Sequence, residues 1–301
     1  MLSRDSLARL RSRPMLIAQC TIGALVVVLA VFATAQSGGD PIAYLEDTNL
    51  AHFSDVDLDV YIPAYYAREP DLQRRLVDYV ERSLGQRFEF PAPMYALDRC
   101  DCVTFVERVY ALALAWDRES FYGLVSRLRH KDGQEGYLNR NHFTVGEWVP
   151  NNAWLFDDLT RELGHGDPKP WIPMHHIIRR TAFFAKQGIT VDIPDEKVVD
   201  AFIPREAIAD LLDQLQTSDV VLLIRGELGN QYCQHWGIII VDSGDPTAPL
   251  AERLEIACAG EPHSLTMPLM EYLDVRTCFQ GCKFLRPWPN AEERAVQELQ
   301  R

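Results

Sequence analysis

The chain has 301 residues, of which 47% are hydrophobic and 24% are charged, and its formal net charge is −13. This composition excludes a disordered chain, a collagen-like chain and a small scaffold held together by disulfides. A chain of this length buries a core without the help of a metal or a disulfide, so it has room for an enzyme of one large domain or two modest ones.

The first 35 residues are typical of an export segment. Four arginines precede an apolar run over residues 15–33, which a small-residue A-T-A sequence ends at Ala35. This order predicts a signal peptide over residues 1–35 and a periplasmic or extracellular protein. The run is also long enough for a tilted span, so an uncleaved inner-membrane anchor is the alternative and would be the chain's contact with a membrane. Without the segment the net charge is about −16, which argues against nucleic acid as a partner.

The next residues predict a lead-in and a first helix. Residues 36–70 mix acidic and apolar side chains without a clear period, and Pro63 and Pro70 favour an extended lead-in there. Apolar residues at helical spacing then predict a helix over residues 71–84, which stops at Gly85.

A second helix is predicted from Cys102 to about Trp116, with an apolar stripe beside exposed Glu107 and Arg108. The following segment, about residues 117–216, has the pattern of helix and loop. A short helix ends it over about residues 205–216.

The last third of the chain changes to apolar runs that are too short for helices and are separated by glycines. We expect an antiparallel meander whose strands cover residues 220–224, 237–241, 254–259 and 283–285. The sequence G-E-L-G-N at residues 226–230 predicts a hairpin turn, and residues 243–249 predict another connection. The charged tail, residues 290–301, is expected to be a solvated helix or a frayed end.

The candidate nucleophile is a cysteine at a helix start. Asp101 is a natural N-cap, which places Cys102 in the first turn, where free backbone N–H groups and the helix dipole favour a thiolate. The matching base is His235 at the start of a predicted strand, because an imidazole can take the thiol proton and later protonate a leaving amine. The alternatives are a structural histidine and a buried cysteine, or a disulfide between Cys102 and Cys100.

The other cysteines do not predict a metal site. The C-x-C and C-x3-C spacings fit zinc-binding patterns poorly. Two pairings are candidate disulfides after export, Cys278–Cys282 and Cys233–Cys258.

The motifs also resemble a known family. D-C-V-T-F-V-E at residues 101–107 closely resembles the signature of an NlpC-like bacterial family of cell-wall amidases, long catalogued as a domain of unknown function. R-N-H-F at residues 140–143, with Trp148 following, resembles that family's R-x-H-Y/F motif. Residues 218–221, before H-W-G-I-I, and residues 284–287 resemble its paired catalytic strands and its closing strand.

The resemblance spans about residues 84–287 and implies an α+β, papain-like NlpC-type cysteine peptidase fold. In this fold an antiparallel sheet packs on the nucleophile helix, and helical insertions are added. We therefore expect an amidase domain over residues 71–289 with an insertion at about residues 117–216. The implied substrate is peptidoglycan or a muropeptide, cleaved between N-acetylmuramic acid and L-alanine, and no metal or organic cofactor is implied.

By the same resemblance Cys102 is the nucleophile and His235 the base. Arg140, His142 and Asp101 are the candidate substrate-binding residues. The planar guanidinium of Arg140 suits a carboxylate of the stem peptide, because the two pair through parallel hydrogen bonds. His142 is a candidate helper rather than the base.

One position departs from the family pattern. The family usually carries a polar residue, often histidine, on the strand after the catalytic histidine, where this chain has Ile256. Glu255 and His263 are the candidate substitutes, although strand alternation puts Glu255 on the face opposite Ile256. The apolar residue favours a catalytically silent peptidoglycan-binding module, and a stem-peptide endopeptidase cutting after D-glutamate is a further alternative. The combination of C-x-x-F-V-E and R-x-H-F favours the amidase.

Overall fold

The computed structural model of the protein describes residues 42–163, 170–242 and 244–301. The predicted export segment, residues 1–35, lies outside the described residues. Within the described ranges, no helix is long and apolar enough to cross a membrane.

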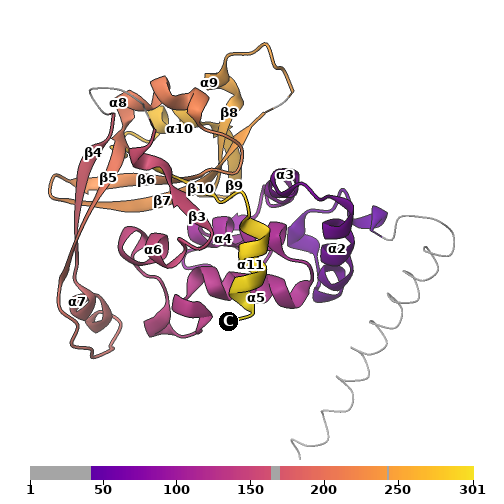
Figure 1. Ribbon diagram of the computed structural model, residues 1–301, viewed down its shortest axis with the longest axis horizontal. Coiled ribbons are helices and arrows are strands. Elements are labelled where there is room, and N and C mark those ends of the chain that lie inside the picture. The colour runs from indigo at the N-terminus through magenta and orange to yellow at the C-terminus, as the bar shows by residue number, and fades with distance from the viewer. Residues whose placement is uncertain (1–41, 164–169, 243) are drawn as a thin grey trace, which may run out of the picture.

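Helices dominate the first half of the described chain (Figure 1). The α-helices of this half are α2 (Asp55–Arg68), α3 (Leu72–Arg82), α4 (Cys102–Leu114), α5 (Arg118–Arg129) and α6 (Val149–Asn151). The second half has α7 (Arg180–Ala185), α8 (Arg205–Ile208), α9 (Leu250–Arg253), α10 (Leu269–Val275) and α11 (Ala291–Leu299). The structure confirms the predicted helices at residues 71–84, 102–116 and 205–216, the last of them as α8 followed by the 3-10 helix η8 (Ala209–Gln214).

In the described residues, eight strands form an antiparallel sheet in the order β4-β5-β10-β6-β7-β8-β9, with β3 also paired to β10. These strands are β3 (Phe156–Asp158), β4 (Ile172–Ile178), β5 (Glu196–Pro204), β6 (Val220–Glu227), β7 (Asn230–Val241), β8 (Leu254–Ala259), β9 (Ser264–Pro268) and β10 (Gly281–Pro287). A separate parallel pair consists of β1 (Arg87–Phe88) and β2 (Arg99–Cys100). The expected antiparallel sheet is therefore confirmed, since β6, β7, β8 and β10 contain the four predicted runs.

The hairpin between β6 and β7 is confirmed. Glu227 pairs with Asn230, and Gly229 adopts a φ of +89°, a value that glycine tolerates and other residues rarely adopt. The strand β7 begins seven residues earlier than predicted, so His235 lies inside a strand rather than at its start.

Helices cover both faces of the sheet (Figure 1), and both faces are buried. One face, which carries Leu222, Trp236 and Ile238, shares a core with α2, α3, α4, α5 and α11. The opposite face, which carries Leu223 and Ile256, packs against α8, η8 and α10. Burial on both sides explains why these strands are almost continuously apolar in the sequence.

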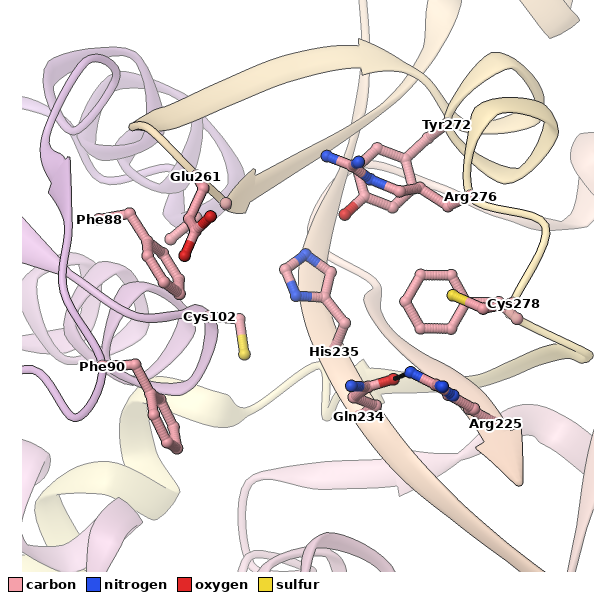
Figure 2. A pocket seen from close by; sticks show the side chains of 13 residues that line it. Phe88, Phe90, Cys102, Arg225, Gln234, His235, Glu261, Tyr272, Arg276 and Cys278 are labelled. Carbon is pink, nitrogen blue, oxygen red and sulfur yellow. Dashed lines mark hydrogen bonds between the residues drawn. The ribbon is translucent and has the colours of Figure 1, made fainter. Parts of the chain in front are cut away.

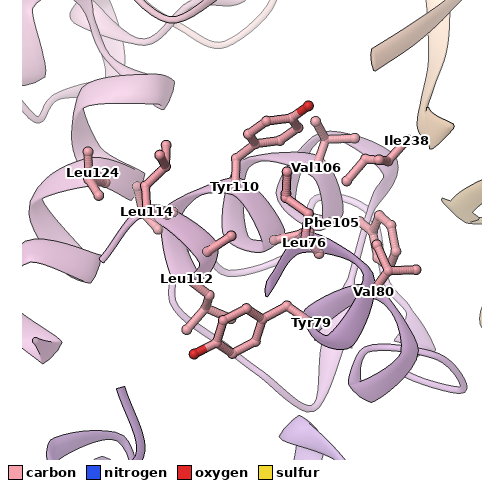
Figure 3. Packing of buried hydrophobic residues seen from close by; sticks show 14 of the residues in the cluster. Leu76, Tyr79, Val80, Phe105, Val106, Tyr110, Leu112, Leu114, Leu124 and Ile238 are labelled. Carbon is pink, nitrogen blue, oxygen red and sulfur yellow. The ribbon is translucent and has the colours of Figure 1, made fainter. Parts of the chain in front are cut away.

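The helix α4 lies at the centre of the larger core. Its apolar stripe packs against α3, α5 and the sheet, where Figure 3 shows Phe105, Val106 and Tyr110 among neighbours such as Leu76 and Ile238. The sheet thus packs on the helix that begins with Cys102, as expected.

The prediction that Glu107 and Arg108 are exposed was wrong. Glu107 is 1% exposed, and its carboxylate accepts hydrogen bonds from Arg129 Nε at 2.8 Å and from Trp148 Nε1 at 3.0 Å. Arg108 is 3% exposed and donates to the backbone oxygens of Thr104 and Arg99. Charged residues on a helix are usually solvated, but here side chains from later segments pair with Glu107, and backbone oxygens near the start of α4 accept from Arg108.

The extended lead-in predicted for residues 36–70 was wrong for residues 55–68, which form α2 with Pro63 inside it. Tyr61 and Tyr65 are buried against Tyr79 of α3, with ring centroids 6.3 and 5.7 Å away. A proline inside a helix costs about 3 kcal/mol, whereas each large buried side chain contributes about 1.5–3 kcal/mol. Burial of the apolar face of α2 therefore outweighs the proline.

The prediction of helix and loop for residues 117–216 missed β3, β4 and β5. The strands β4 and β5 form an arm that extends beyond the rest of the sheet and ends at α7 (Figure 1). At its base, Lys283 of β10 is fully buried, and its Nζ lies 2.7 Å from Asp158 Oδ2 of β3 and 2.9 Å from Asp200 Oδ2 of β5. These contacts between distant residues leave no local periodic signal.

The charged tail forms α11, which packs on the body of the protein through buried Ala291 and Ala295. Glu298 also pairs with Arg127 of α5 at 2.7 Å. The tail is therefore a docked helix rather than a frayed end.

The two predicted disulfides are not formed, because the six cysteines of the described chain are free. Cys258 belongs to the core on the α10 face of the sheet, whereas Cys233 packs on the opposite core, so the sheet lies between them. Cys282 is buried in β10, while Cys278 is exposed.

We expect Glu107→Ala to lower the free energy of unfolding by about 3–5 kcal/mol, because it leaves the buried guanidinium of Arg129 without its partner. Urea denaturation followed by circular dichroism measures this loss. The matched control is Glu81→Ala, an exposed glutamate in the last turn of α3, for which we expect a change below about 0.5 kcal/mol. Equal losses in the two variants would contradict a structural role for Glu107.

Candidate active site

Cys102 is the first residue of α4, and its position is fixed by the cap that precedes it. Asp101 Oδ1 accepts a hydrogen bond from the N–H of Thr104 at 2.8 Å, and Thr104 Oγ1 accepts one from the N–H of Asp101 at 2.8 Å. The other carboxylate oxygen of Asp101 accepts from the N–H of Ala92 at 2.9 Å, so it also holds the loop before β2. The reciprocal cap leaves the first backbone N–H groups of the helix unpaired beside the cysteine.

His235 lies in β7 next to an irregularity in the sheet. Leu223 pairs with His235, but the next residue, Ile224, pairs with Cys233, so Gln234 is an extra residue in β7. Such a bulge bends a strand and redirects its side chains, and bulges are frequent next to active sites. This one immediately precedes the predicted base.

Cys102 and His235 line one pocket of about 470 Å³, which we call the Cys102 pocket (Figure 2). Its wall comes from the loop before α4, the β6–β7 hairpin, the end of β8 and the segment from α10 to β10. The lining residues are Phe88, Phe90, Cys102, Arg225, Gln234, His235, Ala259, Gly260, Glu261, Tyr272, Arg276, Cys278 and Phe279. The backbone N–H of Trp236, the residue after His235, faces the thiol of Cys102 and acts to lower its pKa.

Aromatic rings hold the imidazole of His235. The Tyr272 ring is stacked on it at a centroid distance of 5.7 Å and an interplanar angle of 9°, and the Phe279 ring lies at 6.3 Å and 26°. Within the described residues, His235 Nε2 is buried and has no hydrogen-bond partner. Stacking, rather than a carboxylate or an amide, therefore fixes the plane of this ring.

Comparison with known proteins places the chain in a family. A model of the AmiA-like family, described as N-acetylmuramoyl-L-alanine amidase-like, matches residues 77–278. The chain belongs to this family. The matched range contains both Cys102 and His235. No curated protein matches the chain.

Solved structures share the fold. A Legionella pneumophila protein of family DUF1460 aligns with a TM-score of 0.66 at 20% sequence identity, over 77% of this chain and 94% of that one. An N-acetylmuramoyl-L-alanine amidase from Bacteroides uniformis aligns with a TM-score of 0.55 at 18% identity, over 72% of this chain and 98% of its own. At such identities the likeness is one of fold.

The pocket favours uncharged forms of both candidate catalytic groups. Burial raises the pKa of the Cys102 thiol, and the Asp101 carboxylate raises it further, against a smaller opposite effect of the Trp236 backbone N–H. Burial lowers the pKa of His235 to about 4, and the positive charge of Arg276 acts in the same direction. At neutral pH the free protein therefore holds a thiol beside a neutral imidazole, unlike the thiolate expected from the helix start.

Glu255 and His263 do not line the Cys102 pocket. Glu255 of β8 pairs with Ile240 of β7 and with Pro268 of β9. His263 is exposed and forms an isolated bridge with Arg87. Ile256 is buried over Gly237, where its Cγ1 would lie 2.5 Å from an added Cβ, so this position packs the sheet.

Arg140 and His142 also lie outside this pocket. Arg140 lines a second pocket of about 450 Å³ together with Arg129 and His130. His142 is half-buried, and its Nε2 lies 2.7 Å from the carbonyl oxygen of Tyr137. The third candidate for substrate binding, Asp101, is 1% exposed and uses both carboxylate oxygens for the cap and the loop described above.

Most residues of the pocket wall carry no signal in the sequence. Tyr272, Arg276 and Phe279 come from a helix and a loop that carry no recognised motif. Phe90, which is 74% exposed, lies in a proline-containing loop, and the one available signal was that binding residues are frequent on loops.

We expect Cys102 to react slowly with iodoacetamide at pH 7 and to react faster as the pH rises through 9, because its raised pKa keeps the thiol protonated. Mass spectrometry of the peptide that contains Cys102 measures the rate, and exposed Cys278 on the same chain is the internal reference. A rate that is already constant above about pH 5 would instead show a thiolate paired with a protonated histidine.

Proposed function

We propose that the protein is a cysteine-dependent amidase with an NlpC-like, papain-like fold, which cleaves the amide between N-acetylmuramic acid and L-alanine in peptidoglycan fragments. The observation that carries the proposal is the meeting of Cys102, at a helix start, with His235, on the adjoining strand, in one pocket. Membership of an N-acetylmuramoyl-L-alanine amidase-like family supports the choice of bond.

The reaction proceeds by acyl transfer through the cysteine. Since both groups are neutral, the thiol proton passes to His235 as Cys102 Sγ attacks the lactyl carbonyl of the muramic acid. The C–N bond then breaks, His235 gives the proton to the nitrogen of L-alanine, and a thioester remains. Water, activated by His235, hydrolyses the thioester and restores the thiol. The free N–H groups of the first turn of α4 stabilise the oxyanion.

A neutral Cys102 thiol and a neutral His235 imidazole suit this reaction, because His235 must act first as a base and then as an acid. Burial keeps the pKa of His235 below neutrality in the free protein, so the imidazole is available to accept the thiol proton. The same burial makes the protonated ring unstable, which favours rapid transfer of the proton to the leaving amine. The stacked rings of Tyr272 and Phe279 replace the hydrogen-bonding residue that usually orients such a histidine.

The silent peptidoglycan-binding module is the second candidate. Apolar Ile256 in β8 and the unpartnered Nε2 of His235 in the described structure favour it. The endopeptidase that cuts after D-glutamate is the other enzymatic alternative, because it would use the same cysteine and histidine.

We further propose that residues 1–35 direct export or anchor the protein in the inner membrane. One catalytic domain over residues 71–289 would then act on muropeptides in the periplasm or outside the cell.

The three functions give different products from one muramyl peptide. We expect the wild-type protein to release the L-alanyl peptide, detected by mass spectrometry, and Cys102→Ala to release none. Cleavage after D-glutamate would identify the endopeptidase, and an unchanged but bound substrate would identify the module. The matched control is Cys278→Ala, since this cysteine lines the same pocket but lies in the loop after α10; we expect it to retain activity.

Two variants at Tyr272 test how His235 is oriented. Tyr272→Ala removes the stacked ring, and we expect kcat to fall by about 10- to 100-fold with little change in KM, because a misdirected imidazole transfers protons poorly. Tyr272→Phe keeps the ring and should stay within about threefold of wild type. If Tyr272→Phe lowers kcat as much as Tyr272→Ala does, the hydroxyl of Tyr272, and not the stacking of its ring, orients His235.

A further inference from the structure

Two arginines of the Cys102 pocket lack a carboxylate partner in the described residues, whereas most other arginines there have one. Ion pairs with aspartate or glutamate neutralise most arginines of the described residues. Arg225 and Arg276 have no such pair in the described chain. Arg225 Nη1 donates to Gln234 Oε1 at 2.9 Å, and the guanidinium carbon of Arg276 lies 5.6 Å from the centre of the Tyr272 ring. Both guanidinium groups keep donors for an anion.

The pocket has two sides with His235 between them (Figure 2). Cys102 lies on what we call the aromatic side, which also has Phe88, Phe90 and Glu261. The opposite side, which we call the arginine side, has Arg225 and Arg276. The aromatic side thus carries a negative charge, whereas the arginine side, which also contains the Tyr272 ring, carries two positive charges.

The proposed chemistry fixes which part of a substrate lies on each side. The acyl carbon must reach Cys102, and the leaving nitrogen must reach His235, which protonates it. The leaving fragment therefore extends past His235 toward the arginine side, and the acyl fragment stays on the aromatic side.

We propose that Arg225 and Arg276 bind carboxylates of the leaving stem peptide, while Phe90 packs on the sugar of the acyl fragment. This inference rests on the proposed amidase function and adds its specificity-determining residues. The ring of Phe90 is 74% exposed, which leaves an apolar surface for the C–H face of a pyranose. Arginines beyond His235 replace Arg140, which lies in the other pocket, as ligands of the peptide.

The same arrangement disfavours the endopeptidase. That reaction would place the α-carboxylate of D-glutamate on the acyl fragment, beside Glu261 on the aromatic side. Like charges repel in a partly enclosed pocket, so the D-glutamate carboxylate of that acyl fragment is unfavourable beside Glu261.

The test compares N-acetylmuramoyl-L-Ala-D-Glu with the same compound amidated at both glutamate carboxyls. We expect wild-type kcat/KM to be at least about tenfold higher for the acidic substrate, as one charge-assisted contact provides. Arg225→Gln and Arg276→Gln should lose this preference through KM, and Phe90→Ala should weaken both substrates equally. The control is Arg294→Gln, an arginine of α11 that also lacks a carboxylate partner in the described residues but lies outside the pocket.

Equal rates of the two substrates with wild type, or an undiminished preference in both pocket variants, would overturn the inference. If wild type cleaves neither compound, the proposed function fails, and calorimetry with the free dipeptide L-Ala-D-Glu decides the inference separately. Binding to wild type that Arg276→Gln weakens about tenfold would support it, and no binding to wild type would overturn it.

Discussion

One buried carboxylate, that of Glu107, links the helix that carries Cys102 to the strand that carries His235. Glu107 of α4 binds Arg129 of α5 and the indole of Trp148, and Trp148 in turn packs on Trp236 with ring centroids 4.5 Å apart. Trp236 is the residue after His235, so this chain of contacts runs from the helix of the nucleophile to the strand of the base. Each link is fully buried, where a lost partner is costly. The position of Cys102 relative to His235 therefore depends on a charge that lies away from the pocket.

The helix of Cys102 and the central strands could be predicted because their signals are local. Asp101 and Thr104 form the cap within four residues, and β6 and β8 are short apolar runs between turns. Three features could not be predicted, because they depend on partners that are remote in the chain. These features are the burial of Glu107, the arm of β4 and β5, and the packing of α2. The part of the pocket wall that contains Tyr272 and Arg276 could not be predicted for the same reason. A single residue at a bulge, Gln234, redirects His235 without any periodic sign in the sequence.

The motif residues divide into two groups in the structure. Cys102 and His235 face the pocket, whereas Asp101, Glu107 and Trp148 hold the helix and strand in place. The motif therefore contains residues that stabilise the fold as well as residues that face the pocket. The residues that face the proposed substrate, such as Arg276 and Phe90, lie on loops outside the motifs, where variation can change specificity without loss of the core.

The carboxylate of Asp101 serves the α4 cap and the N–H of Ala92 at once. The loop that carries Phe90 is thereby fastened to the first turn of α4 by an oxygen that is almost fully buried. Because one oxygen of this carboxylate caps the helix and the other holds the loop, displacement of Asp101 would weaken both contacts. Local unfolding at the start of α4 is thus coupled through Asp101 to the loop that carries Phe90 on the aromatic side.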